Sequence, residues 1–390
     1  MGAQNSIKKE NHENEWENIQ EKNNSEQSNN SIDSKKITDD KKEKNEDIIP
    51  CEDEYLDNKY INIINKEKYI SKDDALIFSK VGTQNNIPWV YKNQNNNTPA
   101  IIRLHNEIIN YVNYISLSEN ERQIREDVIR KSYLFRFKEE IVNAFPGVDI
   151  KVYGSFCTGL CTKKSDIDLS VEIDSINSKS ISLRSIYQVL IKSTLCAQAT
   201  LIEEASVPII KLIEKSQQIH FDFSINAYDG IKAASVIKDV IKRFPHFRYL
   251  TIFLKDFLKK RKNNETYYEG VGSHLLNVLV IRYLQYKYKI LQEVKNFNLG
   301  TALIDLFTFY GRQFNNKKVG INIHKEGFFF KRPFECLEGI SVINPINLNQ
   351  DIGKFIDWNL IKDTFNIARD ILLFGENDTN SILGKIINTK

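Results

Sequence analysis

The sequence predicts an α+β fold in which a small mixed β-sheet packs on a mostly helical domain, with a cleft between them. Two patterns predict this fold. Between residues 146 and 226, short apolar stretches are bounded by Gly, Pro and polar residues, which is the pattern of strands. From about residue 236 the apolar residues return to helical spacing, and 390 residues are enough for two domains with separate cores.

Residues 1–85 are rich in Asn, Lys, Glu, Ser and Gln and contain almost no apolar cluster, so we expect a disordered polar tail. The rest of the chain is expected to form three stretches. These are N-terminal helices of the helical domain over residues 86–135, the sheet domain over residues 136–235, and the main part of the helical domain over residues 236–385.

Two helices are expected before the sheet. The first covers Thr98–Ile115, with Pro99 at the first helical position. The second lies within residues 116–145, where Ser118 and Glu121 form a capping-box pattern and a Pro-Gly pair follows the last helical residue.

The β region is predicted to consist of short strands, with one helix over Ser182–Thr194. The strands are expected at residues 149–155, 166–173, 200–205, 207–214 and 219–226, with a turn or short helix after the first. The later helices follow from apolar positions with helical spacing. They are expected at Phe247–Lys262, Ser273–Lys289, Gly300–Tyr310 and near Asn359–Leu373.

Charge is spread unevenly along the chain. The full sequence has a net charge of +3, but residues 1–50 contain 8 Lys and 12 Asp and Glu, which leaves +7 on the remainder. A mildly basic folded region is compatible with a polyanionic ligand, and it also occurs in many proteins that bind none. Charge alone therefore selects no partner.

The five cysteines are odd in number and scattered, which argues against a disulfide framework and for a reducing compartment. Cys157 and Cys161 lack a second ligand pair nearby, so we interpret them as packing residues rather than as part of a zinc site. We expect no transmembrane segment, because no apolar run approaches the ~18–20 residues that a membrane helix needs. No signal-peptide pattern opens the chain either.

The opening "MGAQNSIKK" fits the acceptor pattern for N-myristoylation, with Gly2 and Ser6 in the required places. A chance match within a polar tail is the alternative, and the sequence favours neither. A single acyl chain on Gly2 would give only marginal membrane contact.

Acidic residues interrupt two stretches that otherwise read as buried strands. Asp166 and Asp168 are two residues apart, so on a strand they would point the same way and repel each other unless a cation lies beside them. Asp222 has the same apolar surroundings in "HFDFSIN". An exposed sheet face lined with acids is the alternative. Three carboxylates converging from neighbouring strands form a site for two Mg²⁺ ions, as used in phosphoryl or nucleotidyl transfer.

Gly154 and Ser155 lie at the end of the first predicted strand. A glycine at a strand end that turns into a helix lets backbone N–H groups and a serine hydroxyl approach phosphate oxygens. A Gly-Ser pair alone is not specific, but here an Asp-x-Asp pattern on a strand follows within a dozen residues.

The pattern G-S-x(10)-D-I-D-L, with Asp222 downstream, resembles the nucleotidyltransferase signature of the DNA polymerase β superfamily. The wider order of "VPIIKLIEKSQQIHFDFSIN", "LGTALIDLFTFYGRQFNNKKVGINI" and "NPINLNQDIGKF" is similar to that of template-independent RNA nucleotidyltransferases. Among these, the chain resembles the TRAMP-complex type of nuclear-surveillance poly(A) polymerase, which has a PAP-associated domain. The resemblance covers roughly residues 86–375.

The resemblance implies roles for several residues. Asp166 and Asp168 would bind two Mg²⁺ ions, which Mn²⁺ can replace. Asp222 would complete the site for the catalytic ion and accept the proton of the RNA 3′-hydroxyl. The triphosphate would be held by Gly154, Ser155, Lys255 and Lys259. The two lysines are four residues apart on one helical face, and the alternatives for the run Lys259–Lys262 are a solvated helix end or a nuclear-localisation patch.

The base-recognition residues depart from the family pattern. His274 and Leu275 stand where the family carries a small residue and an aromatic residue that stacks on the base. Asn344 replaces an acid, and Gln350, which offers both a donor and an acceptor, favours ATP over UTP. The resemblance places two more residues, Ser273 and Asp351, in the nucleotide site. A polar side chain facing phosphate or solvent is the alternative for His274.

The resemblance therefore implies a Mg²⁺-dependent enzyme that adds AMP from ATP to RNA 3′ ends in RNA processing or surveillance, with its active site in the cleft. A terminal uridylyltransferase on the same scaffold is one alternative. An inactive scaffold that recruits RNA-decay factors is another, which three intact aspartates disfavour. The expected partners are the RNA 3′ end, an RNA-binding subunit and a helicase. The expected location is nuclear, or cytoplasmic or membrane-associated if Gly2 is acylated.

Overall fold

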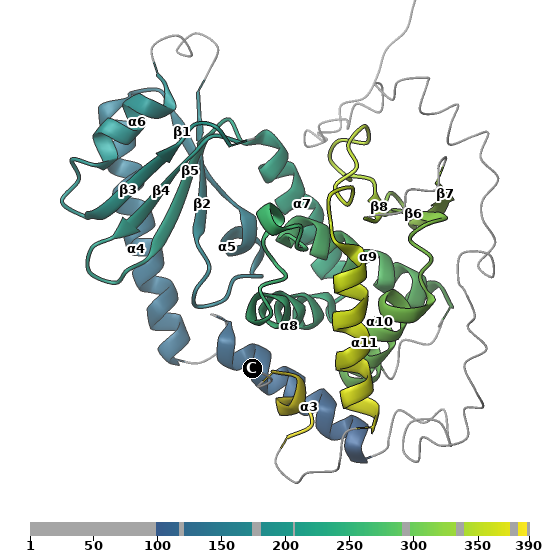
Figure 1. Cartoon of the computed structure of the whole chain (residues 1–390). Helices are drawn as coiled ribbons and strands as arrows, with labels where there is room; N and C mark the ends of the chain where they lie inside the picture. The colour runs from purple at the N-terminus through teal and green to yellow at the C-terminus, as the bar shows by residue number, and fades with distance from the viewer. Residues whose placement is uncertain are drawn as a thin grey trace, which may run out of the picture. The chain divides into compact units, whose positions relative to one another are not determined.

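The computed structural model confirms the α+β fold class (Figure 1). It describes residues 99–116, 121–173, 181–205, 207–290, 297–332, 339–374 and 381–387. The expected polar tail, Gly2 and the capping residues Thr98 and Ser118 lie outside the described residues. None of the helices in the described residues is long and apolar enough to cross a membrane.

A five-stranded mixed sheet forms the first body. Its strands are β1 (Asp149–Tyr153), β2 (Ile167–Glu172), β3 (Cys196–Ile202), β4 (Ile209–Glu214) and β5 (His220–Ile225). They lie in the order β1-β2-β5-β4-β3, with β2 and β5 parallel and the other pairs antiparallel. The parallel pair aligns Asp168 with Asp222. All five strands overlap the predicted stretches, although β3 begins four residues earlier than expected.

Two helices, α4 (Glu121–Ala144) and α6 (Leu183–Leu190), pack with one face of this sheet (Figure 1). Phe137 of α4 is fully buried, and its ring centroid lies 5.0 Å from that of Phe221 on β5. The domain boundary expected between residues 135 and 136 falls within α4, whose buried residues belong to the sheet core. The domain division itself stays a prediction.

Two further helices pack against β1, at one side of the sheet. α5 (Gly154–Thr158) follows β1 directly and contacts β1, β2 and α7 (Tyr228–Arg243). The helical spacing expected from residue 236 thus begins eight residues earlier, at Tyr228. Because α7 follows β5 after two residues, the chain leaves the sheet directly beside the predicted site.

The second body has a core built mainly from helices. α3 (Pro99–Ile115) shows why the sequence folds this way, because Ile101, Leu104, Ile108 and Val112 form one buried stripe. One helix, α10 (Leu299–Thr308), continues directly into a short π-helix, Phe309–Gln313. The other helices of this body are α8 (Phe247–Lys260), a 3₁₀ turn (Thr266–Tyr268), α9 (Ser273–Ile290), α11 (Trp358–Phe374) and α12 (Gly384–Ile387).

A small second sheet, which the sequence did not predict, lies in the helical body. It consists of β6 (Val319–Asn322), β7 (Phe328–Lys331) and β8 (Ser341–Val342), in the order β7-β6-β8. All four residues of β6 are buried, so the strand lacks the polar–apolar alternation that marks a half-buried strand. β8 leads into the loop that carries Asn344 and Gln350.

Candidate active site

The aspartates at the centre of the site come from two adjacent parallel strands. Asp168 on β2 and Asp222 on β5 are register partners, so their side chains leave the sheet on the same face. Adjacent strands lie about 4.8 Å apart, which is close enough for the two carboxylates to repel each other strongly.

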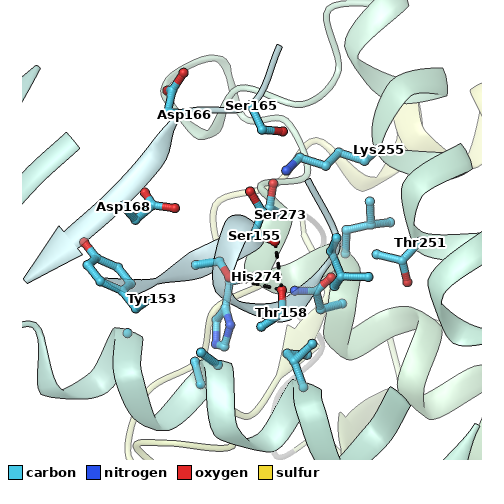
Figure 2. A pocket seen from close by; sticks show the side chains of 18 of the residues that line it. Tyr153, Ser155, Thr158, Ser165, Asp166, Asp168, Thr251, Lys255, Ser273 and His274 are labelled. Atoms are coloured by element: carbon cyan, nitrogen blue, oxygen red, sulfur yellow. Dashed lines mark hydrogen bonds between the residues drawn. The ribbon is translucent and has the colours of Figure 1, made fainter. Parts of the chain in front are cut away.

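Asp166 lies differently from the prediction. β2 begins at Ile167, so Asp166 precedes the strand, and the expectation that it shares a strand face with Asp168 is wrong. Figure 2 shows the two carboxyl groups pointing in different directions. The Asp166 Oδ1 atom lies 4.0 Å from Nδ1 of His220, at the start of β5.

Burial and neighbouring negative charge disfavour ionisation of Asp168 and Asp222. Burial, followed by the charges of Asp222 and Asp166, raises the pKa of Asp168 from 3.8 to about 7. Opposing effects come from the Lys255 charge and from the Ser155 backbone N–H, which donates a hydrogen bond to Asp168. Burial also raises the pKa of Asp222, although the Nζ of Lys211 lies 3.2 Å from Asp222 Oδ2 and lowers it.

Gly154 is required by its close approach to Asp168. It has a φ of +65°, and a Cβ atom at this position would lie 1.9 Å from Oδ2 of Asp168. A larger residue would therefore push the carboxyl group out of place. The same contact places the backbone at the start of α5, including Ser155, against the carboxylates.

A basic stripe faces these acids from α8. Lys255 and Lys259 are one helical turn apart, and both line the cavity, as predicted from their spacing. Lys255 is partly buried, which lowers the pKa of its ammonium group, while Asp168 acts in the opposite direction. Figure 2 shows the Lys255 side chain reaching into the cavity. Thr251, one turn earlier, also lines the cavity, and its buried hydroxyl has no hydrogen-bond partner among the described residues.

The far end of the site holds a chain of amide and imidazole groups. His274 Nε2 lies 3.1 Å from Oδ1 of Asn344, and Asn344 Nδ2 donates to Gln350 Oε1 at 2.7 Å. The Asn344 oxygen also accepts from the backbone N–H of Ile346 at 3.1 Å. Because this oxygen accepts, the geometry fits a His274 tautomer that carries its proton on Nε2. The Gln350 amide nitrogen is left with two N–H groups that can point at a ligand.

A single cavity of about 740 Å³ connects these parts and lies between the sheet body and the helical body. Its walls therefore come from both cores, as expected for the predicted cleft. The candidate site residues that line this cavity are Gly154, Ser155, Asp166, Asp168, Thr251, Lys255, Lys259, Ser273, His274, Asn344 and Gln350.

Comparison with known proteins places this site in a family. A family model described as the central palm domain of mitochondrial-like poly(A) RNA polymerase matches residues 104–241, and the Cid1 family poly A polymerase model matches residues 298–350. The solved polymerase core of TRAMP, an RNA surveillance complex, is 27% identical, with a TM-score of 0.64 over 74% of this chain and 95% of that one. Over residues 104–241 and 298–350, the chain carries the palm and PAP-associated domains of the poly(A) RNA polymerase family.

Two curated relatives of this chain show the range within the family. The poly(A) RNA polymerase cid14 of Schizosaccharomyces pombe is 29% identical over 69% of this chain and 40% of its own length. The inactive non-canonical poly(A) RNA polymerase protein Trf4-2 of Drosophila melanogaster is 32% identical over 60% of this chain and 56% of its own. The chain thus spans only about half the length of these relatives.

The acidic centre of the site has the chemistry of a divalent-cation site. Carboxylate oxygens are the ligands that Mg²⁺ prefers, and a cation would relieve the repulsion that raises the pKa of Asp168. In the described part of the chain, no three His, Cys, Asp or Glu side chains are already gathered to hold a metal ion. Asp168 and Asp222 would hold the ion, and Asp166 would have to turn from His220 to join them.

Two residues predicted for the nucleotide site lie elsewhere in this polymerase-family fold. Leu275 is 4% exposed and belongs to the hydrophobic core, because it points away from the cavity on the buried face of α9. The Asp351 carboxylate accepts hydrogen bonds from Ser341 Oγ and from the backbone N–H groups of Val342 and Gly353. It therefore fixes the turn after β8 rather than facing the cavity.

Two polar residues in or beside the site, Thr251 and Lys211, were not predicted from the sequence. Thr251 could have been found from its spacing, since it lies four residues before Lys255 and eight before Lys259. Lys211 could not, because its contact with Asp222 depends on the pairing of β4 with β5. Asn344 was noted only as a departure from the family, and its bond to His274 depends on the approach of the β8 loop to α9.

Proposed function

We propose that the protein transfers nucleotides from a nucleoside triphosphate to the 3′ end of RNA, without a template and with AMP as the favoured unit. Asp168 lines one cavity together with Asp166 and Lys255, and it is paired on the adjacent strand with Asp222; this arrangement is the observation that carries the proposal. The palm and PAP-associated domains of the poly(A) RNA polymerase family support the same reaction.

The reaction needs the triphosphate and the RNA hydroxyl to be held in line. Lys255 and Lys259 supply positive charge on the side where the pyrophosphate leaves. Ser155 offers a hydroxyl and lies against the carboxylates. Divalent ions bound to Asp166, Asp168 and Asp222 would neutralise the phosphate oxygens and acidify the RNA 3′-hydroxyl.

Asp222 is the proposed acceptor for the proton of the RNA 3′-hydroxyl. Burial raises its pKa, which brings the group nearer to the pH at which a general base works well. Lys211, which lies 3.2 Å from Asp222, keeps its carboxylate ionised and oriented until the substrate arrives.

Base selection is proposed to occur at His274, Asn344 and Gln350. The Gln350 amide nitrogen can donate to a ring nitrogen of adenine, while Asn344 holds the Gln350 oxygen and so fixes which way the amide faces. Uracil could accept the same donor through a carbonyl oxygen, so uridylyl transfer is the alternative that the experiment must separate.

The test incubates the full-length chain with a 5′-labelled RNA primer, Mg²⁺ and each of the four nucleoside triphosphates in turn. We expect extension with ATP well above that with UTP, and none with EDTA. Extension with UTP alone would replace the adenylating proposal by the uridylating one. No extension with any nucleotide would favour an inactive scaffold, and the Drosophila relative is itself named as inactive.

A partner subunit and a nuclear location are part of the same proposal. The TRAMP polymerase core belongs to an RNA surveillance complex, and GLD-2 was solved in complex with RNP-8. The primer assay is therefore run with and without nuclear extract. Mass spectrometry of the native N-terminus tests whether Gly2 carries an acyl chain, and a C-terminal fluorescent tag shows whether Gly2→Ala moves the protein.

A further inference from the structure

Arg130 is a buried cation on α4 that no part of the proposed reaction uses. It is 7% exposed. Its guanidinium group donates to two backbone carbonyls, from Nη1 to Ser165 at 2.8 Å and from Nη2 to Lys163 at 2.6 Å. Both carbonyls belong to the short loop that ends at Asp166. Arg130 therefore holds the segment that delivers one of the three acids.

The same loop is held from the helical body on its other side. The backbone N–H of Lys163 donates to the carbonyl of Ile115 at the end of α3, and Ser116 forms an isolated bridge with Thr162. Within the loop, the Ser165 hydroxyl accepts from the backbone N–H of Thr162 at 2.9 Å. Arg130, on a helix that packs with the sheet, adds two hydrogen bonds to the same loop, so the loop has little freedom to shift.

Arg130 is not stabilised by an ion pair with a neighbouring carboxylate of the described residues. Within the described ranges, no carboxylate oxygen lies within ion-pair distance of its guanidinium group, and burial lowers its pKa. A buried cation without a paired anion is costly, and an apolar side chain of similar size is often as stable. The two charge-assisted hydrogen bonds offset part of this cost and fix the planar geometry of the carbonyls. The charges of Cys161, Glu126, Asp166 and Asp127, in decreasing order, act on the pKa of Arg130 in the opposite direction and raise it.

We propose that Arg130 is a positioning residue for Asp166, which acts by fixing the carbonyls of Lys163 and Ser165. Arg130 fixes the position of the backbone directly before β2. It thereby fixes the position from which the Asp166 side chain can rotate towards Asp168. The proposal rests on the proposed function, because it assigns Asp166 to the divalent-cation site.

The test compares Arg130→Gln and Arg130→Lys in the full-length chain with Arg136→Gln as the matched control. Arg136 lies on the same helix, is exposed, and stacks on Tyr133. Each protein is titrated with Mn²⁺, and free Mn²⁺ is followed by electron paramagnetic resonance, which needs no activity. Residues behind metal ligands typically change metal affinity or activity by 10–100-fold. We expect Arg130→Gln to weaken Mn²⁺ binding by about tenfold or more, whereas Arg136→Gln binds as wild type does.

Steady-state kinetics supply the second readout. We expect kcat of Arg130→Gln to fall by about 10–100-fold and its KM for ATP to stay within about threefold, because the lysines of α8 are untouched. Arg130→Lys keeps the charge but loses the planar fork, so an intermediate loss is expected. If Arg130→Gln does not fold, judged by circular dichroism and melting temperature, Arg130→Lys carries the comparison.

Wild-type Mn²⁺ affinity and kcat in folded Arg130 variants would overturn the positioning role. A loss of melting temperature with unchanged Mn²⁺ affinity would also overturn it, since that pattern marks a structural residue only. A wild-type protein that extends no primer contradicts the proposed function instead. The Mn²⁺ titration still decides the role of Arg130 in that case.

Discussion

At Asp168, a carboxyl group is held where its charge is disfavoured, next to Asp222 on the adjacent strand. Its pKa rises from 3.8 to about 7, so between these values the folded chain keeps a proton that the unfolded chain releases. Raising the pH through this window therefore lowers the free energy of unfolding. The proposed chemistry needs an ionised Asp168, and without a bound cation this ionised form destabilises the folded protein.

Asp168→Asn should stabilise the protein at pH 8 in EDTA, by on the order of 1–3 kcal/mol, and this gain should disappear near pH 4. Asparagine keeps the shape but cannot ionise, so the pH-dependent loss is removed. Melting temperatures measured from pH 4 to pH 8 check this. Mg²⁺ should raise the melting temperature of wild type only.

Asp363→Asn is the matched control for this change, because Asp363 is exposed on α11. Its melting temperature should follow that of wild type at every pH. If the melting temperatures of wild type and Asp168→Asn depended equally on pH, the pKa of Asp168 would not be raised by burial and its neighbours.

Gly154→Ala should abolish most of the activity, whereas Gly159→Ala should keep it within about threefold. Both glycines have a positive φ, so both variants pay roughly 1 kcal/mol in the free energy of unfolding. A Cβ on Gly154 would lie 1.9 Å from the Asp168 carboxylate, but a Cβ on Gly159 meets nothing within 4 Å. A denaturant titration measures the cost of backbone strain in both variants. Primer extension measures the additional effect of displacing the Asp168 carboxylate, which only Gly154→Ala should show. Equal activity of the two variants would contradict the close approach.

Residue types and the family resemblance together pointed to the acids, the Gly-Ser pair and the two lysines as candidate site residues. They were not enough to place Asp166, because a strand start within one residue depends on the neighbouring strands. Leu275 was misplaced for a related reason. One residue along a helix turns a side chain by about 100°, which decides between the cavity and the core.

Among the elements, α4 links the two bodies in the chain but packs with the sheet. Phe137→Ala should lower the free energy of unfolding by about 3–5 kcal/mol, because its ring is fully buried against Phe221 and Phe223. Phe135→Ala, two residues away on the same helix, removes a ring that is 61% exposed and should cost less than about 0.5 kcal/mol. Urea unfolding of both variants checks this. Equal losses would mean that α4 does not anchor the sheet.

Elements with a clear period could be predicted, and those without one could not. α3 carries a regular buried stripe, and β1, β2 and β5 are bounded by turns and polar residues. The start of α7 was missed because Tyr228-Asp229-Gly230 has little helical preference, and contacts with α5 and β1 hold it. The second sheet was missed because its strands are two to four residues long, and β6 and β8 are buried throughout.

For the whole molecule, the site depends on two bodies that meet at one cavity. The sheet brings the carboxylates, α8 brings the lysines, and the loop after β8 brings the amides to His274. The sequence predicted that a cleft would lie between the bodies. It could not predict the distances between their side chains, because these are set by packing between segments up to two hundred residues apart.

The central claim is that the paired aspartates and the lysines of α8 act as one nucleotidyl-transfer site. Single-turnover addition of AMP to a 5′-labelled RNA primer, at saturating ATP and Mg²⁺, tests it most directly. We predict that Asp222→Asn slows the transfer by on the order of 10³-fold, whereas Asp363→Asn stays within about twofold of wild type. Transfer by Asp222→Asn at the wild-type rate would contradict the claim.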